Sequence, residues 1–271
     1  MSVDKTKICA LGALYHGERA EYLHSCLVSL QNQTIKIPIV FVIDGPITSD
    51  LEDVLERFDD LGVRFIRNPV NKGLSYALQS GLDLIRNDFD YAIRFDSDDI
   101  NLPNRFEKLR TYIYEHNPDL VSSHMYEINE KNEVFSERKV PIGYDRIAKK
   151  LPYRNPINHP ASAFKISSVL AAGGYQEMPF FEDWYLWTRM FHAGFKIENI
   201  DDFLVSFRAT DAMVARRYGV SYVKHEASFF LRRSTENLIN PIENWLAFLS
   251  RLAVKAFGFK AYKTFFYWIR K

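Results

Sequence analysis

The sequence predicts an α/β fold in which a mainly parallel sheet lies between layers of helices, followed by a C-terminal helical extension. Short apolar runs alternate with longer amphipathic segments through about the first 100 residues. This alternation is typical of right-handed strand–helix–strand units, which build parallel sheets. The chain has 271 residues, 47% of them hydrophobic and 25% charged, which is typical of a large globular domain with an appended region.

The spacing of apolar residues predicts the elements of the first half in order. Short apolar runs indicate strands, and apolar residues three and four positions apart indicate helices. The predicted strands are residues 7–13, 38–43, 63–66 and 91–95, and the predicted helices are residues 18–31, 50–58 and 74–85. Ligands bind beyond the carboxyl ends of the strands in such sheets. We therefore expect residues 15–18, Asp44 and residues 96–99 to share one ligand site.

The second half is less regular and ends in a region of different character. The patterns predict a helix at residues 105–116, a strand at 120–126, a polar hairpin at 127–140 and a loop at 152–160. After residues 203–207 the sequence is helical, basic and aromatic. Residues 208–271 carry 12 Lys and Arg against 4 Asp and Glu, whereas the net charge of the whole chain is only +1. We therefore separate a main domain, residues 1–207, from a helical region, residues 208–271.

Cysteine content and hydropathy indicate a cytoplasmic protein. Cys9 and Cys26 are too few for a disulfide framework and lie in apolar runs, so we expect buried free thiols. The apolar stretch at residues 8–15 ends in polar residues without a cleavage site, which favours a buried strand over a signal peptide. No apolar run reaches the ~20 residues that a membrane span requires.

A cluster of acids, Asp96-Ser97-Asp98-Asp99, directly follows the predicted strand at residues 91–95. Carboxylates this close repel one another unless a cation or ordered donors offset the charge, and their oxygens suit Mg²⁺ or Mn²⁺. A solvated acidic turn or a helix N-terminus is the alternative. An EF-hand is excluded because Asn101 stands where that loop requires glycine. The cluster is therefore interpreted as a binding site for a metal ion that is itself bound to a diphosphate.

A second acidic pair, Glu182-Asp183, lies in an aromatic run. Burial among aromatic side chains raises the pKa of a carboxylate and makes it a better base, although acids also favour the start of a helix, here at residues 184–191. With a metal site elsewhere on the sheet, a base is the favoured interpretation. His159 could orient a substrate, ligate metal or be structural, and the turn at Gly174 could let the backbone approach a ligand.

An ordered set of motifs resembles the bacterial family 2 glycosyltransferases of GT-A fold, and more narrowly the O-antigen and exopolysaccharide transferases related to amylovoran biosynthesis. The motifs are Asp44-Gly45-Pro46, Asn71-Lys72-Gly73-Leu74, Arg94-Phe95-Asp96-Ser97-Asp98-Asp99, Asn158-His159-Pro160, Ala172-Gly173-Gly174-Tyr175 and Glu182-Asp183. The resemblance implies a donor-binding half at about residues 1–100 and an acceptor-binding half at about 101–207.

The resemblance also implies roles for single residues. Asp183 would be the catalytic base and Glu182 its neighbour at the acceptor. Asp96, Asp98 and Asp99 would hold Mn²⁺ or Mg²⁺. The remaining assignments are Ala13, Tyr15, Glu18, Asp44, Asn71, Lys72, Asp96 and Ser97 to the nucleotide sugar, and His159, Gly174 and Trp184 to the acceptor. Many relatives have a metal-binding histidine after the last strand, where this chain has Arg208-Ala209-Thr210-Asp211, so Asp211 or a water could take its place.

The implied reaction moves one hexose from a UDP-sugar, with UDP-galactose favoured, to a lipid-diphosphate-linked saccharide, and inverts the anomeric configuration. A Q-x-x-R-W signature of processive polymerases is absent, which predicts a non-processive enzyme. We expect no nucleic-acid partner. A sugar nucleotidyltransferase and a non-catalytic nucleotide-sugar-binding protein remain as alternatives.

The end of the chain suggests a contact with an anionic membrane surface. Residues 244–271 contain no acids and interleave aromatic residues with six cations, Arg251, Lys255, Lys260, Lys263, Arg270 and Lys271. Such segments favour the headgroup region of a membrane. We therefore expect a peripheral protein at the inner face of the cell membrane, with a C-terminal helix packed on the main domain as the alternative.

Overall fold

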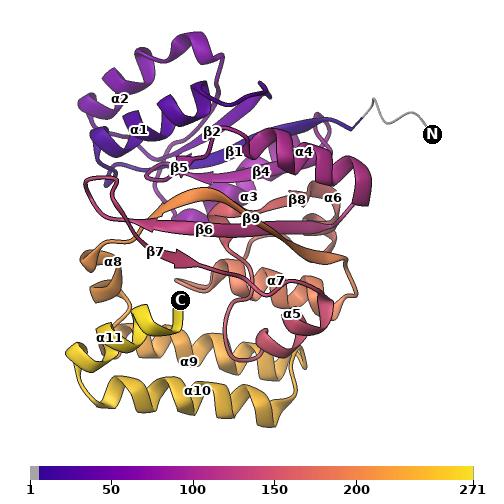
Figure 1. Ribbon diagram of the computed structural model, residues 1–271, viewed down its shortest axis with the longest axis vertical. Helices are drawn as coiled ribbons and strands as arrows, with labels where there is room; N and C mark the ends of the chain where they lie inside the picture. Colours follow the sequence, from indigo (N-terminus) through magenta and orange to yellow (C-terminus); the bar gives the residue numbers. More distant parts are fainter. Residues whose placement is uncertain (1–5, 271) are drawn as a thin grey trace.

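A mixed sheet runs through the molecule with helices on both of its faces, which confirms the predicted fold class (Figure 1). The computed structural model describes residues 6–270 of the chain, with side chains through residue 265. Within these residues the sheet has nine strands in the order β3-β2-β1-β4-β8-β6-β9-β5, and β7 pairs with β6. The order places β1 and β4 side by side, so their carboxyl ends lie together at one edge of the sheet.

The first half follows the predicted alternation closely. Its elements are β1 (Ile8–Leu14), α1 (Ala20–Gln31), β2 (Ile39–Asp44), α2 (Ser49–Glu56), a short 3-10 turn (Asp59–Leu61), β3 (Arg64–Asn68), α3 (Leu74–Ile85) and β4 (Tyr91–Asp96). β1 pairs in parallel with both β2 and β4, and β2 pairs in parallel with β3. Every predicted strand and helix of this half is present, with ends that differ by a few residues.

The second half adds antiparallel and very short strands. Its elements are β5 (Ile100–Asn101), α4 (Arg105–His116), β6 (Leu120–Ile128), β7 (Val134–Arg138), α5 (Tyr144–Lys150), a 3-10 turn (His159–Ala161), β8 (Ala163–Lys165), α6 (Ile166–Ala171), α7 (Glu182–His192) and β9 (Ile197–Arg208). β9 is parallel to β6 and antiparallel to β5, and its pairing with β6 contains register shifts at Ser123 and His124.

Two hydrophobic layers hold the helices to the sheet. On one face Phe41 and Phe95 pack with the apolar sides of α1, α2 and α4. On the other face Leu11 and Val42 pack with α3, α6 and α7, including the fully buried Trp187. Cys9 and Cys26 are both buried and free, as predicted, one in each layer.

The C-terminal region packs against α7 and does not extend away from the domain. It consists of α8 (Asp211–Arg216), α9 (Val220–Thr235), α10 (Pro241–Ala256) and α11 (Phe259–Arg270), with α9 and α10 side by side (Figure 1). Phe229 of α9 stacks on Phe181 at 4.8 Å between ring centroids and contacts Trp184, and Phe248 of α10 packs on Phe230. This is the packed arrangement that the sequence left as an alternative.

Several of the C-terminal cations face the protein. Arg251 and Lys255 both bind the buried Glu226, and Lys263 binds Asp211. Arg270 and Lys271 lie outside the described side chains. Among the described residues, no helix combines the length and apolar character that a membrane crossing needs.

Candidate active site

A cavity of about 870 Å³ opens at the carboxyl ends of β1, β2 and β4, where the topology predicts a ligand site. We call it the strand-edge cavity. Its lining includes residues 13–19, Tyr22, Asp44, Asn71 and Asp96, together with Arg208 and residues of α8. Tyr15 and Glu18 line it, so the structure gathers most of the residues that sequence analysis assigned to the nucleotide sugar.

The acidic turn after β4 carries much of the negative charge of this cavity. Asp96, Ser97 and Asp98 line it. Asp96 forms an ion pair with Arg94, and the Ser97 hydroxyl donates a 2.7 Å hydrogen bond to a Glu18 carboxylate oxygen. Burial, together with the negative charges of Asp96 and Glu18, raises the pKa of the Asp98 carboxyl to about 8. The turn therefore concentrates negative charge where little solvent screens it.

Asp99 points away from the cavity. Its Oδ1 accepts a 2.8 Å hydrogen bond from the Arg208 backbone amide, and its Oδ2 is buried without a hydrogen-bond partner. Burial, followed by the charges of Asp98 and Asp96, raises the pKa of the Asp99 carboxyl. Of the three predicted metal ligands, Asp96 and Asp98 line the cavity and Asp99 does not.

The donor set of the cavity fits a hard divalent cation that is bound only partly by protein. No group of three or more His, Cys, Asp or Glu side chains in the described part of the chain is arranged to hold a metal. The carboxylates of Asp96 and Asp98 are the ligand type that Mg²⁺ and Mn²⁺ prefer, and Mg²⁺ often takes its other ligands from substrate phosphates and water. Asp211 lies outside the cavity and binds Lys263 at 2.7 Å.

Asp44 fixes the loop that precedes α3. Its carboxylate accepts hydrogen bonds from the backbone amides of Gly73 at 2.8 Å and Lys72 at 3.1 Å, and from the Asn68 side chain at 3.3 Å. Asp44 and Asn71 line the strand-edge cavity, whereas the Lys72 ammonium lies over the Tyr76 ring. The structure therefore gives Asp44 a structural role beside its predicted contact with the base.

Sequence reasoning missed the arginines that support the acidic turn. Arg94 is fully buried within β4 and pairs with Asp96. Arg208 donates from Nε to the Asp98 carbonyl oxygen at 2.9 Å, and its guanidinium lies 3.9 Å from the centre of the Tyr22 ring. The sequence contained a signal for Arg94, because a charge inside an apolar strand needs a partner.

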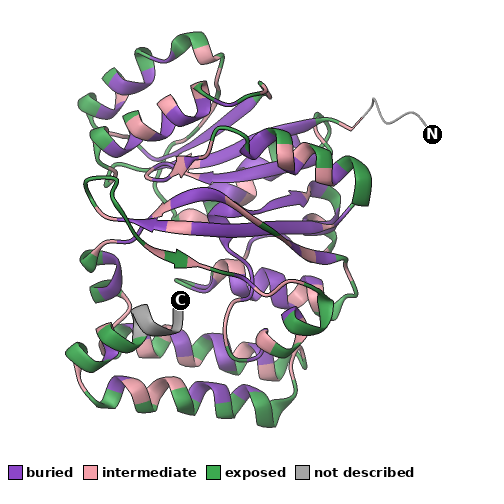
Figure 2. Ribbon diagram, in the orientation of Figure 1, coloured by how far each residue is buried: buried purple, intermediate pink, exposed green. Residues whose placement is uncertain are grey.

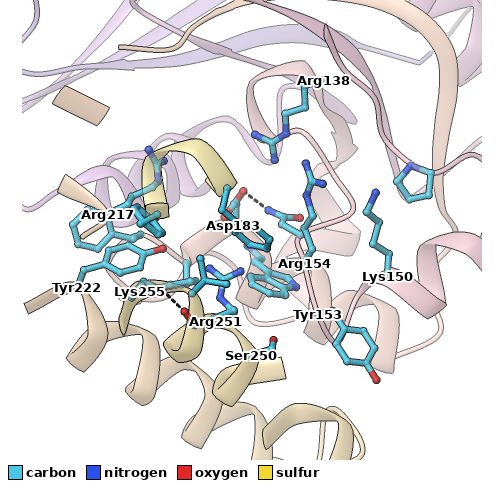
Figure 3. A pocket seen from close by; sticks show the side chains of 18 of the residues that line it. Arg138, Lys150, Tyr153, Arg154, Asp183, Arg217, Tyr222, Ser250, Arg251 and Lys255 are labelled. Atoms are coloured by element: carbon cyan, nitrogen blue, oxygen red, sulfur yellow. Dashed lines mark hydrogen bonds between the residues drawn. The ribbon is translucent and has the colours of Figure 1, made fainter. Parts of the chain in front are cut away.

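A second cavity, of about 1000 Å³, lies between α5, the start of α7 and the C-terminal helices. We call it the basic cavity. Figure 3 shows Arg138, Arg154 and Arg217 around Asp183 within it. Eight cationic side chains line it, namely Arg138, Arg146, Lys149, Lys150, Arg154, Arg217, Arg251 and Lys255. Arg217 also lines the strand-edge cavity, so the two cavities meet at this residue.

The acidic pair forms the first turn of α7, where acids are favoured by the helix dipole. Asp183 Oδ2 accepts from the Asn155 amide at 2.7 Å, and Oδ1 accepts from the Trp184 backbone amide at 2.7 Å. Burial raises the pKa of Asp183, and burial and then the Asp183 charge raise the pKa of Glu182 to about 7. Asp183 faces the basic cavity with its orientation fixed by two donors.

The three residues assigned to the acceptor lie at different depths. Trp184 lines the basic cavity, although its ring is mostly buried against Phe229 and its Nε1 donates to the Leu151 carbonyl oxygen. His159 is buried, and its Nε2 lies 2.8 Å from the Tyr175 hydroxyl, while burial lowers its pKa. Gly174, at φ +64°, lies against Gln79. Neither His159 nor Gly174 is among the described residues that line the two cavities.

Comparison with known proteins connects this architecture to sugar transfer. The model of glycosyl transferase family 2 matches residues 14–172. The amylovoran biosynthesis glycosyltransferase AmsE of Erwinia amylovora is 35% identical over 244 residues, which are 88% of this chain and 90% of that protein. The UDP-Gal:alpha-D-GlcNAc-diphosphoundecaprenol beta-1,3-galactosyltransferase of Escherichia coli is 33% identical over 230 residues, covering 83% of this chain and 82% of that protein.

Solved structures with the same fold are more distant in sequence. S. aureus TarS 1-349 in complex with UDP-GlcNAc matches with a TM-score of 0.65 at 15% identity, over 83% of this chain and 66% of that one. Mannosyltransferase PcManGT from Pyrobaculum calidifontis, in complex with GDP-Man and Mn²⁺, matches with a TM-score of 0.58 at 14% identity, over 94% of this chain and 77% of that one. At such identity the likeness concerns the GT-A fold alone.

The raised pKa of Glu182 predicts a pH-dependent gain in stability for Glu182→Gln. The charged form is disfavoured in the folded state, so wild-type stability falls as pH rises from the ordinary value of 4.5 to about 7 and is level above that. Glutamine imitates the protonated form. Because the side chain is partly exposed, we expect a gain on the order of 1–2 kcal/mol at about pH 8 and a smaller one at about pH 5.

Urea unfolding at both pH values measures this difference, with the exposed Glu21→Gln on α1 as the control. A gain that is equal at the two pH values would contradict the assigned cause.

Proposed function

The chain belongs to glycosyl transferase family 2, and on that premise we propose that it transfers one hexose from a UDP-sugar to a lipid-diphosphate-linked saccharide, with inversion and without processivity. Its family and relatives assign it to bacterial polysaccharide synthesis as a glycosyltransferase. The observation that carries the proposal is the meeting of an acidic strand-edge cavity and a basic cavity at Arg217, with Asp183 facing the latter. Membership of this family favours a sugar transferase over the two alternatives that the sequence left open, a sugar nucleotidyltransferase and a non-catalytic nucleotide-sugar-binding protein.

The proposed donor is a UDP-hexose, with UDP-galactose favoured. The E. coli relative is named for UDP-Gal, and a structural neighbour is bound to UDP-GlcNAc. Tyr15, Asp44 and Asn71 would contact the nucleoside at the carboxyl edge of the sheet, where Ala13, Glu18 and Ser97 also line the cavity. A divalent cation, Mn²⁺ or Mg²⁺, held by Asp96 and Asp98 would neutralise the charge that grows on the departing diphosphate. Arg208 and Arg216 also line this cavity and add positive charge to it.

The proposed chemistry is a single in-line displacement. Asp183 takes the proton from the acceptor hydroxyl while that oxygen attacks the anomeric carbon and the bond to the diphosphate breaks. The raised pKa of Asp183 makes its carboxylate a stronger base, and hydrogen bonds from Asn155 and the Trp184 amide keep it oriented. An α-linked donor then yields a β-linked product, consistent with the beta-1,3-galactosyltransferase name of the E. coli relative.

We also propose that the C-terminal region holds the enzyme at an anionic membrane surface. The outer side of α10 is largely exposed (Figure 2). Ile242, Leu246 and Leu249 on this helix are exposed, and their spacing places them on one face. Since Arg251 and Lys255 bind Glu226, the contact would depend more on this apolar face than on the cations named from sequence. A lipid-linked acceptor would then lie close to the basic cavity.

Replacing the base tests the proposed function. Asp183→Asn keeps the size of the side chain and one oxygen that can accept from Asn155 or the Trp184 amide, but it cannot accept the proton. We expect turnover with UDP-galactose and a saccharide-diphosphate acceptor to fall by a factor on the order of 10²–10⁴ while the affinity for UDP is retained.

Turnover is measured by UDP release and UDP affinity by calorimetry, with the exposed Asp53→Asn on α2 as the control. Turnover near wild type would transfer the role of base to another residue, with Glu182 the next to be substituted.

Removing a carboxylate from the strand-edge cavity tests the metal. Asp98→Ala should abolish transfer and weaken the binding of UDP measured with Mn²⁺ present, because the cation loses a protein ligand next to the diphosphate. Without Mn²⁺ the difference from wild type should be small. Full transfer activity of the wild type in EDTA would show that no divalent cation is needed.

Substitutions on α10 test the membrane contact. Leu246→Asp with Leu249→Asp places charges on the exposed face, and we expect the protein to lose flotation with phosphatidylglycerol vesicles while it retains UDP binding. Leu84→Asp, at an exposed leucine of α3, is the matched control. If the wild type does not float with these vesicles at low salt, the proposed membrane contact is wrong.

A further inference from the structure

The basic cavity concentrates positive charge from four separate segments. Arg138 ends β7, Arg154 follows α5, and Arg217 is the C-cap residue directly after α8. On α5, Arg146, Lys149 and Lys150 are spaced so that they share one face of the helix, and all three line the cavity. Like charges at this spacing destabilise a helix unless an opposite charge lies between them.

The positive charge on α5 has little compensation from the acids that line the cavity. Among the described residues that line the cavity, Asp183 is the sole acid. Glu226 is shared between Arg251 and Lys255, which leaves one positive charge over. Within the described side chains, no ion pair forms to Arg146, Lys149 or Lys150. Burial and then repulsion from Arg154 and Arg138 lower the pKa of Lys150, which indicates a positive potential around its ammonium group.

The shape and the donor geometry suit a phosphate-bearing ligand with a sugar attached. A volume of about 1000 Å³ is at the upper end of the range for small-molecule sites. Guanidinium groups bind phosphate oxygens in pairs, and lysines add point charges. Tyr153, Phe180 and Tyr222 line the same space and offer aromatic faces. Phe180 adopts φ +70°, which is strained for a bulky residue and recurs at functional sites.

We propose that the basic cavity is the binding site for the diphosphate of the acceptor, with Arg146, Lys149, Lys150 and Arg154 holding the phosphates so that the attached saccharide reaches Asp183. This rests on the proposed function, which supplies the class of acceptor. The enzyme then handles two diphosphates by different means. The donor diphosphate lies beside carboxylates, so a cation must bridge the two. The acceptor diphosphate binds ammonium and guanidinium groups directly.

The position of Asp183 assigns the cavity to the acceptor and not to the donor. The base must contact the hydroxyl of the acceptor, and Asp183 lines the basic cavity but not the strand-edge cavity. The carboxylates of Asp96 and Asp98 lie in the other cavity, so the basic cavity offers no acidic pair for a metal–diphosphate. Arg217, at the junction, lies within electrostatic reach of both Glu182 and Asp183.

A pair of acceptors tests the proposal. One carries the saccharide on a diphosphate with a short alkyl chain, and the other carries the same saccharide on a neutral alkyl group. For Lys149→Ala with Lys150→Ala, we expect kcat/KM for the diphosphate acceptor to fall about tenfold or more relative to that for the neutral acceptor, mainly through KM. Lys131→Ala, at an exposed lysine between β6 and β7, should keep the wild-type ratio. An unchanged ratio in the double variant overturns the proposal.

Direct binding separates this proposal from the proposed function. Calorimetry of inorganic pyrophosphate in EDTA should show binding to wild type, at least about tenfold weaker binding to the double variant, and no displacement by UDP. Absence of pyrophosphate binding overturns the diphosphate site. If no acceptor receives sugar but pyrophosphate binds as described, the proposed function fails while the cavity remains an anion site.

A measurement of vesicle binding with the same double variant distinguishes an acceptor diphosphate from a lipid headgroup as the source of the phosphate. If the double variant loses binding to phosphatidylglycerol vesicles yet keeps the wild-type acceptor ratio, the cations serve the membrane surface and the proposal is wrong. If the ratio falls while vesicle binding is retained, the acceptor diphosphate is the ligand.

Discussion

Charge crowding in the turn after β4 is the constraint around which the surrounding structure is arranged. Three carboxylates fall within four residues, and two arginines hold the turn that carries them. Arg94 pairs with Asp96 from inside the strand, and the backbone and guanidinium of Arg208 hold the Asp98–Asp99 segment. Arg105 reaches from α4 to the Arg94 carbonyl oxygen, and burial lowers its pKa to about 9. The neighbouring helix α4 and the strand β9, which is distant in sequence, are thereby both tied to the carboxyl end of β4.

The sequence allowed the first half of the fold to be predicted because local periodicity and topology agree there. The same topology located the strand-edge cavity, since parallel strands end at one edge. The first part of β9 escaped prediction because Glu198, Asp201 and Asp202 interrupt its apolar pattern, and these side chains find partners or solvent outside the core. β5 and β8 escaped because strands of two or three residues exist only through pairing with distant partners.

The basic cavity could not be predicted, because nothing in the local sequence connects its parts. Its cations come from β7, α5, α8 and α10, and only the folded chain brings them together. The C-terminal region was correctly recognised as basic and helical, but its cations were assigned to the outside. Arg251 and Lys255 instead face Glu226 and the cavity, while Ile242, Leu246 and Leu249 of α10 are exposed. One helix thus presents different chemistry on its two sides.

The placement of β9 between β6 and β5 affects how the chain folds during its synthesis. Its last residue, Arg208, contacts Asp99 across 109 positions of sequence. Contacts of such separation are slow to form because a long loop must close first. On the ribosome, therefore, the emerging chain can build β1 to β4 early, but the edge of β6 stays open and the acidic turn lacks its contacts to Arg208 until β9 has been synthesised. The contacts that order the acidic turn are therefore completed only when this late strand docks.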